Sequence, residues 1–231
     1  YNPGKTSIHV TKAWNDAGNK DGKRPLSVKV ELYADGKATG KTATLNESNG
    51  WSYTWSDLDE KSNGRTITYS VKEKDVNAAY TVTYDGDGKG NFTVTNTHTP
   101  ETVDISGSKE WNDAGNEGAR PTKITVRLLA DGREVDYAEA NESNGWSWSF
   151  SGKPKYAAGN EIKYSVVEDN VENYTTEKGT GKYDIKNTYN PGKTSIHVTK
   201  AWNDARNQDG KRPLSVEVEL YADGKATGKT A

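Results

Sequence analysis

The chain has 231 residues, no cysteine and a formal net charge of −2 at pH 7, and 31% of its residues are hydrophobic. Acidic and basic residues are interspersed, which argues against a nucleic-acid-binding stripe or a cationic membrane-binding segment, and no apolar run is long enough to cross a membrane. The low hydrophobic content predicts a thin core. Because the chain can form neither disulfides nor thiolate zinc sites, that core needs another stabilising feature.

Internal repetition dominates the sequence. Residues 1–43 and 189–231 are identical except at three positions, namely Gly18/Arg206, Lys20/Gln208 and Lys29/Glu217. A weaker repeat begins near residue 101, where the strings WND, RP, ADG, NESNGWS and YSV return in the same order. We therefore expect two complete domains and the N-terminal half of a third, at residues 1–99, 100–188 and 189–231. The joints THTPET and TYNPGKT are short, which favours a stiff array.

Both complete domains are predicted to be all-β. Alternating apolar and polar residues indicate strands in domain 1 at residues 8–14, 28–32, 51–55, 67–73, 80–84 and 92–96. The pattern returns in domain 2 at residues 124–128, 146–150, 162–168 and 183–187. No segment convincingly predicts a helix. Six or seven short strands in fewer than about 100 residues indicate a two-sheet sandwich.

Each domain places three polar residues on otherwise apolar strand faces. In the first strand, Lys12 shares a face with Ile8 and Val10, because side chains at i and i+2 project to the same side. An inward lysine is rare without a partner, since desolvating an ammonium is costly. Glu73 and Asn96 end two other apolar faces of domain 1. The corresponding residues of domain 2 are Lys109, Glu168 and Asn187.

These residues lie in strings that resemble a known family. K-x-W-N-D, RP, Y-S-V-x-E and a terminal [TK]-N-T resemble the B-type domains of Gram-positive collagen adhesins, the CnaB family, over domains 1 and 2 and the first half of a third. The resemblance implies tandem inverse immunoglobulin-like β-sandwiches. It also implies a spontaneous amide (isopeptide) bond between a first-strand lysine and a last-strand asparagine, assisted by an acid. The implied triads are Lys12–Asn96 with Glu73 and Lys109–Asn187 with Glu168.

The implied chemistry is physically reasonable. Burial disfavours the charged forms of lysine and glutamate, and a neutral amine is a nucleophile. A protonated Glu73 can donate to the Asn96 carbonyl and then move protons. Folding holds amine and carboxamide together, and well-oriented groups reach effective molarities of about 10⁵ M or more. Ammonia leaves once per domain, so we expect self-processing without a cofactor rather than an enzyme. The alternative is a buried Lys12–Glu73 salt bridge with Asn96 hydrogen-bonded beside it.

Other candidate sites are weaker. The pairs Trp51/Trp55 and Trp146/Trp148 can form a sugar-stacking platform, but their i, i+2 spacing is more typical of a core face. The loops NDAGNKDG and DGDGKG resemble calcium loops only faintly, since both lack the acid at the twelfth position, and turns are expected there instead. The histidines, His9, His98 and His197, are scattered, and nothing indicates a metal site.

The predicted function is a structural stalk. A bond between the first and last strands passes force between domains without stretching the chain between the linked residues. We expect spacer repeats of a bacterial surface protein that is cell-wall anchored in its full-length form. Its partners would be other repeats and a host matrix ligand bound by a distal domain absent here, with no nucleic acid or membrane. The alternatives are a direct binding module for matrix protein or glycan and, more weakly, an enzyme. The chain carries no signal peptide or sorting signal, so we expect a fragment of a longer protein.

The third, partial domain repeats the first lysine without its partners. Residues 189–231 contain Lys200 and two apolar strand faces, Ile196/Val198/Trp202 and Val216/Val218/Leu220, but not the strands that would supply an acid and an asparagine. Two such strands are marginally stable alone. We therefore expect Lys200 to be a free amine, and residues 189–231 to be ordered by packing against another molecule.

Overall fold

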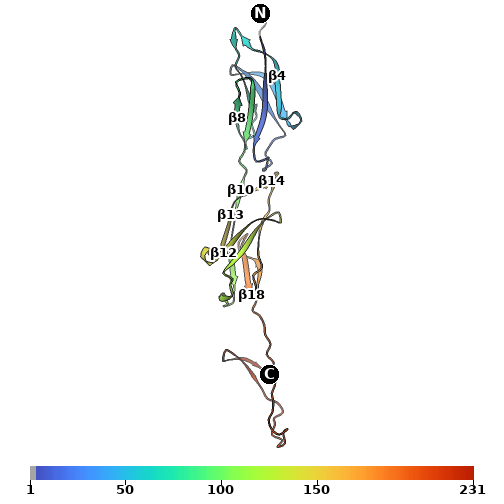
Figure 1. The fold of residues 1–231 in the computed structure, drawn as a ribbon, viewed down its shortest axis with the longest axis vertical. Helices are drawn as coiled ribbons and strands as arrows, with labels where there is room; N and C mark the ends of the chain where they lie inside the picture. Colours follow the sequence, from blue (N-terminus) through green and yellow to red (C-terminus); the bar gives the residue numbers. More distant parts are fainter. Residues whose placement is uncertain (1–3) are drawn as a thin grey trace. The chain divides into compact units, whose positions relative to one another are not determined.

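The computed structural model describes residues 4–231 and confirms the all-β prediction. The first three residues of the predicted domain 1 lie outside the described part. Residues 1–190 and 191–231 form two compact units, and the first unit contains two sandwiches (Figure 1). Between residues 4 and 231 the helical segments are three short 3₁₀ turns, η1 (Glu47–Asn49), η2 (Glu117–Ala119) and η3 (Glu142–Asn144). None of them approaches the length or apolar character needed to span a membrane.

The first sandwich contains nine strands. They are β1 (Lys5–Asn15), β2 (Ser27–Ala34), β3 (Lys37–Asn46), β4 (Ser52–Asp59), β5 (Lys61–Ser62), β6 (Arg65–Thr66), β7 (Tyr69–Lys74), β8 (Thr81–Gly86) and β9 (Asn91–Thr97). One sheet has the order β4-β1-β9-β8 and the other has the order β3-β2-β7, with β5 and β6 forming a small ribbon. The two sheets enclose one apolar core, as expected for a sandwich.

The second sandwich repeats this architecture. Its strands are β10 (Thr102–Asn112), β11 (Lys123–Ala130), β12 (Arg133–Asn141), β13 (Ser147–Pro154), β14 (Tyr156–Ala157), β15 (Asn160–Glu161), β16 (Tyr164–Glu168), β17 (Tyr174–Lys178) and β18 (Ile185–Tyr189). The sheets have the orders β13-β10-β18-β17 and β12-β11-β16, with β14 and β15 forming the ribbon. The second core is separate from the first.

The first and last strands of each sandwich are parallel neighbours. In the pairing of β1 with β9, Lys12 lies opposite Val94 and Trp14 lies opposite Asn96. In the pairing of β10 with β18, Lys109 lies opposite Ile185, and Asn187 follows two residues later. The lysine and the asparagine of each domain therefore share a face and are offset by the same two residues.

The predicted core faces are confirmed along most strands. Val10, Val30 and Val94 are fully buried on inward faces. The segment 51–55 differs, because Trp51 precedes β4 rather than lying on its inner face. The 3₁₀ turn before it ends in the left-handed residue Gly50, and Trp51 itself has φ of 56°, which rotates the chain before the strand begins. Tyr53 is also exposed, since β4 is an edge strand.

The second compact unit keeps only part of its predicted strands. Its hairpin consists of β19 (Glu219–Ala222) and β20 (Lys225–Thr230), and residues 196–202 form no strand. The expected strand faces at 196–202 and 216–220 are therefore wrong except for the end of the second. The physical reason is the lack of partners, because the equivalent β1 is held between β4 and β9, which follow residue 43 in domain 1. Ile196 and Val198 are exposed as a result.

Candidate functional site

The three predicted residues of domain 1 come together inside the sandwich. Lys12 from β1 and Asn96 from β9 meet Glu73, which β7 contributes from the opposite sheet. Asn96 Nδ2 donates to Glu73 Oε1 at 3.0 Å, and Lys12 Nζ lies 3.7 Å from Glu73 Oε2. The side chains of Lys12 and Glu73 are 0% and 2% exposed, so the acid contacts both groups away from water.

The lysine of domain 1 is poorly compensated for a buried ammonium. Its Nζ donates to the carbonyl oxygens of Ala13 at 3.0 Å and Val94 at 3.1 Å and lies 4.2 Å from the centre of the Trp14 ring. Burial lowers the pKa of Lys12 to about 8, although the nearby Glu73 carboxylate opposes this change. A lysine of this kind is much closer to the neutral, nucleophilic amine at pH 7 than an exposed one.

Domain 2 brings its three residues together with a different pattern of hydrogen bonds. Lys109 Nζ donates to Glu168 Oε1 at 2.7 Å, and Thr176 Oγ1 donates to Glu168 Oε2 at 3.1 Å. Burial lowers the pKa of Lys109, while its hydrogen bond to Glu168 opposes the change. Asn187 is fully buried beside this pair.

Both sites contain buried polar atoms without hydrogen-bond partners. These atoms are Glu73 Oε2 and Asn96 Oδ1 in domain 1 and Oδ1 and Nδ2 of Asn187 in domain 2. A buried polar atom without a partner costs about 1–3 kcal/mol, so an ordinary structural network is expected to satisfy these groups. The arrangement thus holds an amine, an acid and a carboxamide together without fully satisfying them.

A second buried cluster was missed from the sequence, although its aspartate and arginine belong to the repeated WND and RP strings. Asp16 Oδ2 accepts from Arg24 Nε and from the Tyr80 hydroxyl, both at 3.0 Å. In domain 2, Asp113 pairs with Arg120 and accepts from the Tyr174 hydroxyl. Burial raises the pKa of Tyr174 to about 12, with a further contribution from that hydrogen bond. The recurrence of Asp and Arg around the first loop was the available signal.

The weaker candidates take structural positions. Trp55 and Trp148 are buried in the two cores. Trp51 and Trp146 are half-buried, and their ring centres lie 5.3 Å from Trp14 and 5.0 Å from Trp111, respectively. The pairs therefore do not form an exposed sugar-stacking platform. The first loop is arranged around Asp16, whose oxygens accept from Arg24, Asn19 and Tyr80 rather than facing an open site.

The remaining predicted residues lie apart from the triads. His9 contacts Thr54, His98 contacts Asp21, and His197 lies beside Thr199. Lys200 is exposed, with its Nζ 4.8 Å from the centre of the Trp202 ring. Whether Lys200 is a free amine, and what covers residues 189–231, stay predictions.

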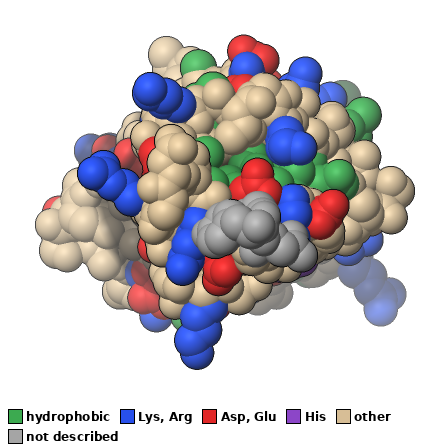
Figure 2. All heavy atoms as spheres, turned by 90° about the horizontal axis from the view of Figure 1, so that it is seen from above, with side chains coloured by type: hydrophobic (Ala, Val, Ile, Leu, Met, Phe, Trp, Pro, Cys, Tyr) green, Lys and Arg blue, Asp and Glu red, His purple; other side chains and the backbone are tan. Residues whose placement is uncertain are grey.

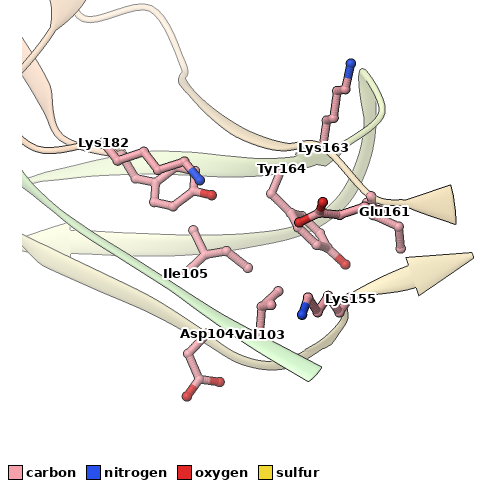
Figure 3. A pocket seen from close by; sticks show the side chains of 10 residues that line it. Val103, Asp104, Ile105, Lys155, Glu161, Lys163, Tyr164 and Lys182 are labelled. Carbon is pink, nitrogen blue, oxygen red and sulfur yellow. The ribbon is translucent and has the colours of Figure 1, made fainter. Parts of the chain in front are cut away.

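The hollow in Figure 3 is not lined by the triad residues of domain 2, Lys109, Glu168 and Asn187. It measures about 520 Å³ and opens between the sheets of domain 2, near Ile105 on β10 and Tyr164 on β16. Lys109 is four residues further along β10, a distance of about 13 Å at the usual rise of a strand. The charged residues around the hollow are of both signs, and Lys155 is paired with Glu101. On the face shown in Figure 2, basic and acidic side chains are likewise interspersed.

Comparison with known proteins identifies relatives of the whole chain. The sequence matches the family described as Cna protein B-type domain over residues 8–97, 105–188 and 196–231. It is 54% identical to a collagen adhesin of Staphylococcus aureus, in an alignment that covers 100% of this chain and 19% of that protein. The chain therefore spans about a fifth of the length of this curated relative.

A solved structure gives the same result for the fold. The crystal structure of two B repeat units, B1B2, of the collagen binding protein of Staphylococcus aureus is 51% identical, with a TM-score of 0.77. The match covers 100% of this chain and 62% of that one. The immunoglobulin-like sandwich predicted from the resemblance is confirmed, and the chain is similar throughout to the B repeats of a collagen adhesin.

Proposed function

The chain belongs to the family of Cna protein B-type domains, and we propose that it is a stalk segment of a bacterial cell-surface adhesin. Each complete domain forms one amide bond between its inward lysine and asparagine, while the buried glutamate moves the protons. The bonds are Lys12–Asn96 and Lys109–Asn187. The reaction occurs once per domain and has no external substrate, so the chain is not an enzyme in the usual sense.

One observation carries the proposal. In both sandwiches the lysine and the asparagine lie on parallel neighbouring strands with the same two-residue offset, and a glutamate from the opposite sheet contacts one or both of them. The two domains differ widely in sequence, so a shared buried constellation supports a shared reaction. The unpaired Oδ1 of Asn96 and the unpaired Oδ1 and Nδ2 of Asn187 support it further, because an ordinary buried network is expected to satisfy such atoms.

The same topology supports a mechanical role. A pull on the ends of domain 1 enters through β1 and leaves through β9, which are parallel neighbours. Such a load shears all of their hydrogen bonds together. A covalent bond from Lys12 to Asn96 transfers the load directly between these strands and leaves residues 13–95 unstretched. Tandem domains of this kind are suited to present a distal, matrix-binding domain from an anchored cell-wall protein.

Intact-protein mass spectrometry tests the proposal. The expected mass is that of the sequence less two molecules of ammonia, one for each complete domain. A mass equal to that of the unmodified sequence would refute amide formation and leave the buried salt bridge as the better account. The alternative function, direct binding of matrix protein or glycan, gains no specific support, since Trp51 and Trp146 pack against the cores.

A further inference from the structure

The two triads differ in what the acid contacts. In domain 1, Glu73 Oε1 accepts from Asn96 Nδ2 at 3.0 Å, while the Lys12 ammonium is 3.7 Å from Oε2 and bonds backbone carbonyls. In domain 2, Glu168 accepts from Lys109 on Oε1 and from Thr176 on Oε2. The acid of domain 1 is therefore directed at the carboxamide, and the acid of domain 2 is not.

The difference originates in one residue on the strand beside the asparagine. Val82 on β8 lies directly opposite Asn96, and Thr176 on β17 lies directly opposite Asn187. Directly opposite residues of antiparallel strands project to the same face, so both side chains turn toward the acid. Valine and threonine have nearly the same shape, but only threonine carries a hydroxyl that donates to a carboxylate.

We propose that Thr176 is a positioning residue that delays amide formation in domain 2, and that Val82 leaves domain 1 free to react first. This inference rests on the proposed function and concerns the rate of its reaction. Both oxygens of Glu168 are occupied by donors other than the carboxamide. These two bonds hold the Glu168 carboxyl group in an orientation without a hydrogen bond to Asn187, whereas Glu73 already contacts Asn96.

The reaction itself is balanced without any further reagent. The lysine Nζ forms a bond to the asparagine Cγ, and the bond from Cγ to Nδ2 breaks. The proton lost by the lysine passes through the glutamate carboxyl to the departing nitrogen, which leaves as ammonia. Thr176 takes no part in these bonds, because it acts only on the orientation of Glu168. A difference of about tenfold in rate corresponds to about 1.4 kcal/mol in the barrier, which is within the range of one hydrogen bond to a charged group.

The test follows bond formation in the whole chain immediately after synthesis. Protein made by cell-free translation is quenched in denaturant at successive times and digested, and mass spectrometry measures the cross-linked peptides of each domain separately. In the natural sequence, domain 1 is expected to react about tenfold faster than domain 2. Thr176→Val is expected to raise the rate of domain 2 by about this factor, and Val82→Thr to lower that of domain 1.

Two further variants separate positioning from simple packing. Thr176→Ser keeps the hydroxyl and is expected to keep the slow rate, although it removes a methyl group. Thr175→Val changes the neighbouring residue, whose hydroxyl faces the Thr188 carbonyl, and is expected to have no effect. Equal rates in the two domains, or a Thr176→Val rate equal to that of the natural sequence, would overturn the inference while leaving amide formation intact. Absence of ammonia loss in every sample would instead overturn the proposed function, and the inference with it.

Discussion

His98 places one ring nitrogen against Asp21 and the other against a backbone carbonyl. Nε2 lies 2.9 Å from Asp21 Oδ2, and Nδ1 lies 2.8 Å from the carbonyl oxygen of Ala79. Both partners accept hydrogen bonds, so both nitrogens donate and the ring is held as the imidazolium. Asp21 Oδ2 also accepts from the Glu101 N–H at 2.8 Å. The pair ties the loop after β1 to the segment that follows β9.

This pair predicts a pH dependence of stability. The hydrogen bond to Asp21 raises the pKa of His98 above its ordinary value of 6.5, and burial and, to a smaller extent, the positive Lys23 oppose this change. Burial disfavours the Asp21 carboxylate, but hydrogen bonds from His98 and Glu101 outweigh it and hold the Asp21 pKa below 3.8. The contribution of His98 to the free energy of unfolding is complete below pH 6.5 and is lost as the pH rises through the raised pKa of His98. The aspartate contribution is present above pH 3.8 and is lost as pH falls, so the pair stabilises most between these values.

The measurement is the melting temperature of domain 1 within the whole chain. We expect it to fall by roughly 2–5 °C on going from pH 6 to pH 9. His98→Tyr introduces the residue that domain 2 has at the same position, Tyr189, and should lack this fall. An unchanged pH profile in His98→Tyr would show that another group is responsible.

Glu73→Ala is expected to leave Lys12 and Asn96 unjoined, because it removes the carboxyl group that is proposed to move protons between them. Domain 2 should still react, so the mass should fall by one ammonia molecule instead of two. The matched control is Glu31→Ala, which removes a buried carboxylate paired with Lys74 on the same sheet. If Glu73→Ala still loses two ammonia molecules, Glu73 is not the acid.

Lys12→Ala is expected to destabilise domain 1 strongly, because it deletes the proposed amide bond to Asn96. The ring that the proposed bond between Lys12 and Asn96 would close spans 85 residues, counting both ends. By analogy with disulfide loop closure, such a ring stabilises by about 4–5 kcal/mol. This corresponds to a fall in melting temperature of roughly 20 °C or more for a domain of this size.

The control for Lys12→Ala is Lys5→Ala on the same strand. Lys5 pairs with Asp59 at the surface, where both side chains are about half exposed, so its loss should change the melting temperature little. Differential scanning calorimetry and resistance to protease measure the stability of both variants. A melting temperature of Lys12→Ala equal to that of the natural chain would mean that the bond does not contribute to stability.

Asp16→Asn should destabilise domain 1 without preventing amide formation. The change removes the charge that faces Arg24 while keeping the shape of the side chain, and Asp16 is 1% exposed. The Arg24 side chain is 28% exposed, so its guanidinium can turn toward water when the charge of Asp16 is removed. The free energy of unfolding should therefore fall by less than for a fully buried pair, by about 2–3 kcal/mol. Chemical denaturation gives the stability, and the mass should still show the loss of two ammonia molecules.

The sequence was sufficient to place the triads on inward faces, because alternation along a strand is a local property. Lys12, Glu73 and Asn96 each share a strand face with apolar residues spaced two apart, and all three are buried in the structure. The sequence alone was not sufficient to show what each side chain contacts. The hydroxyl of Thr176 reaches Glu168 only because β17 pairs with β18 in one register, and register depends on contacts between distant segments.

Residues 189–231, which nearly repeat residues 1–43, show the same difference between structure set by local contacts and structure set by distant ones. The loop that follows the tryptophan folds as it does in domain 1, since Arg212 Nε donates to Asp204 Oδ2 at 2.9 Å as Arg24 does to Asp16. Its bonds join residues eight apart in the chain, so the loop needs no distant partner. The flanking strand is lost, because its equivalent in domain 1 is paired with β4 and β9. Local sequence therefore determines the loop but not the strand.

This contrast gives a final prediction about two lysines in the same sequence context, Thr-Lys-Ala-Trp. Lys12 is 0% exposed at its side chain and lies in the site, whereas Lys200 is exposed. An amine-acylating reagent applied to the folded chain should modify Lys200 at least about tenfold faster than Lys12, since burial excludes the reagent and the proposed amide bond would consume the amine. Peptide mass spectrometry after digestion measures both sites in one sample.

Amide hydrogen exchange should likewise be fast at residues 196–202 and slow at residues 8–14. Protection of 196–202 that disappears on dilution would support packing against another molecule, and an unreactive Lys200 at every dilution would show that it is not a free amine.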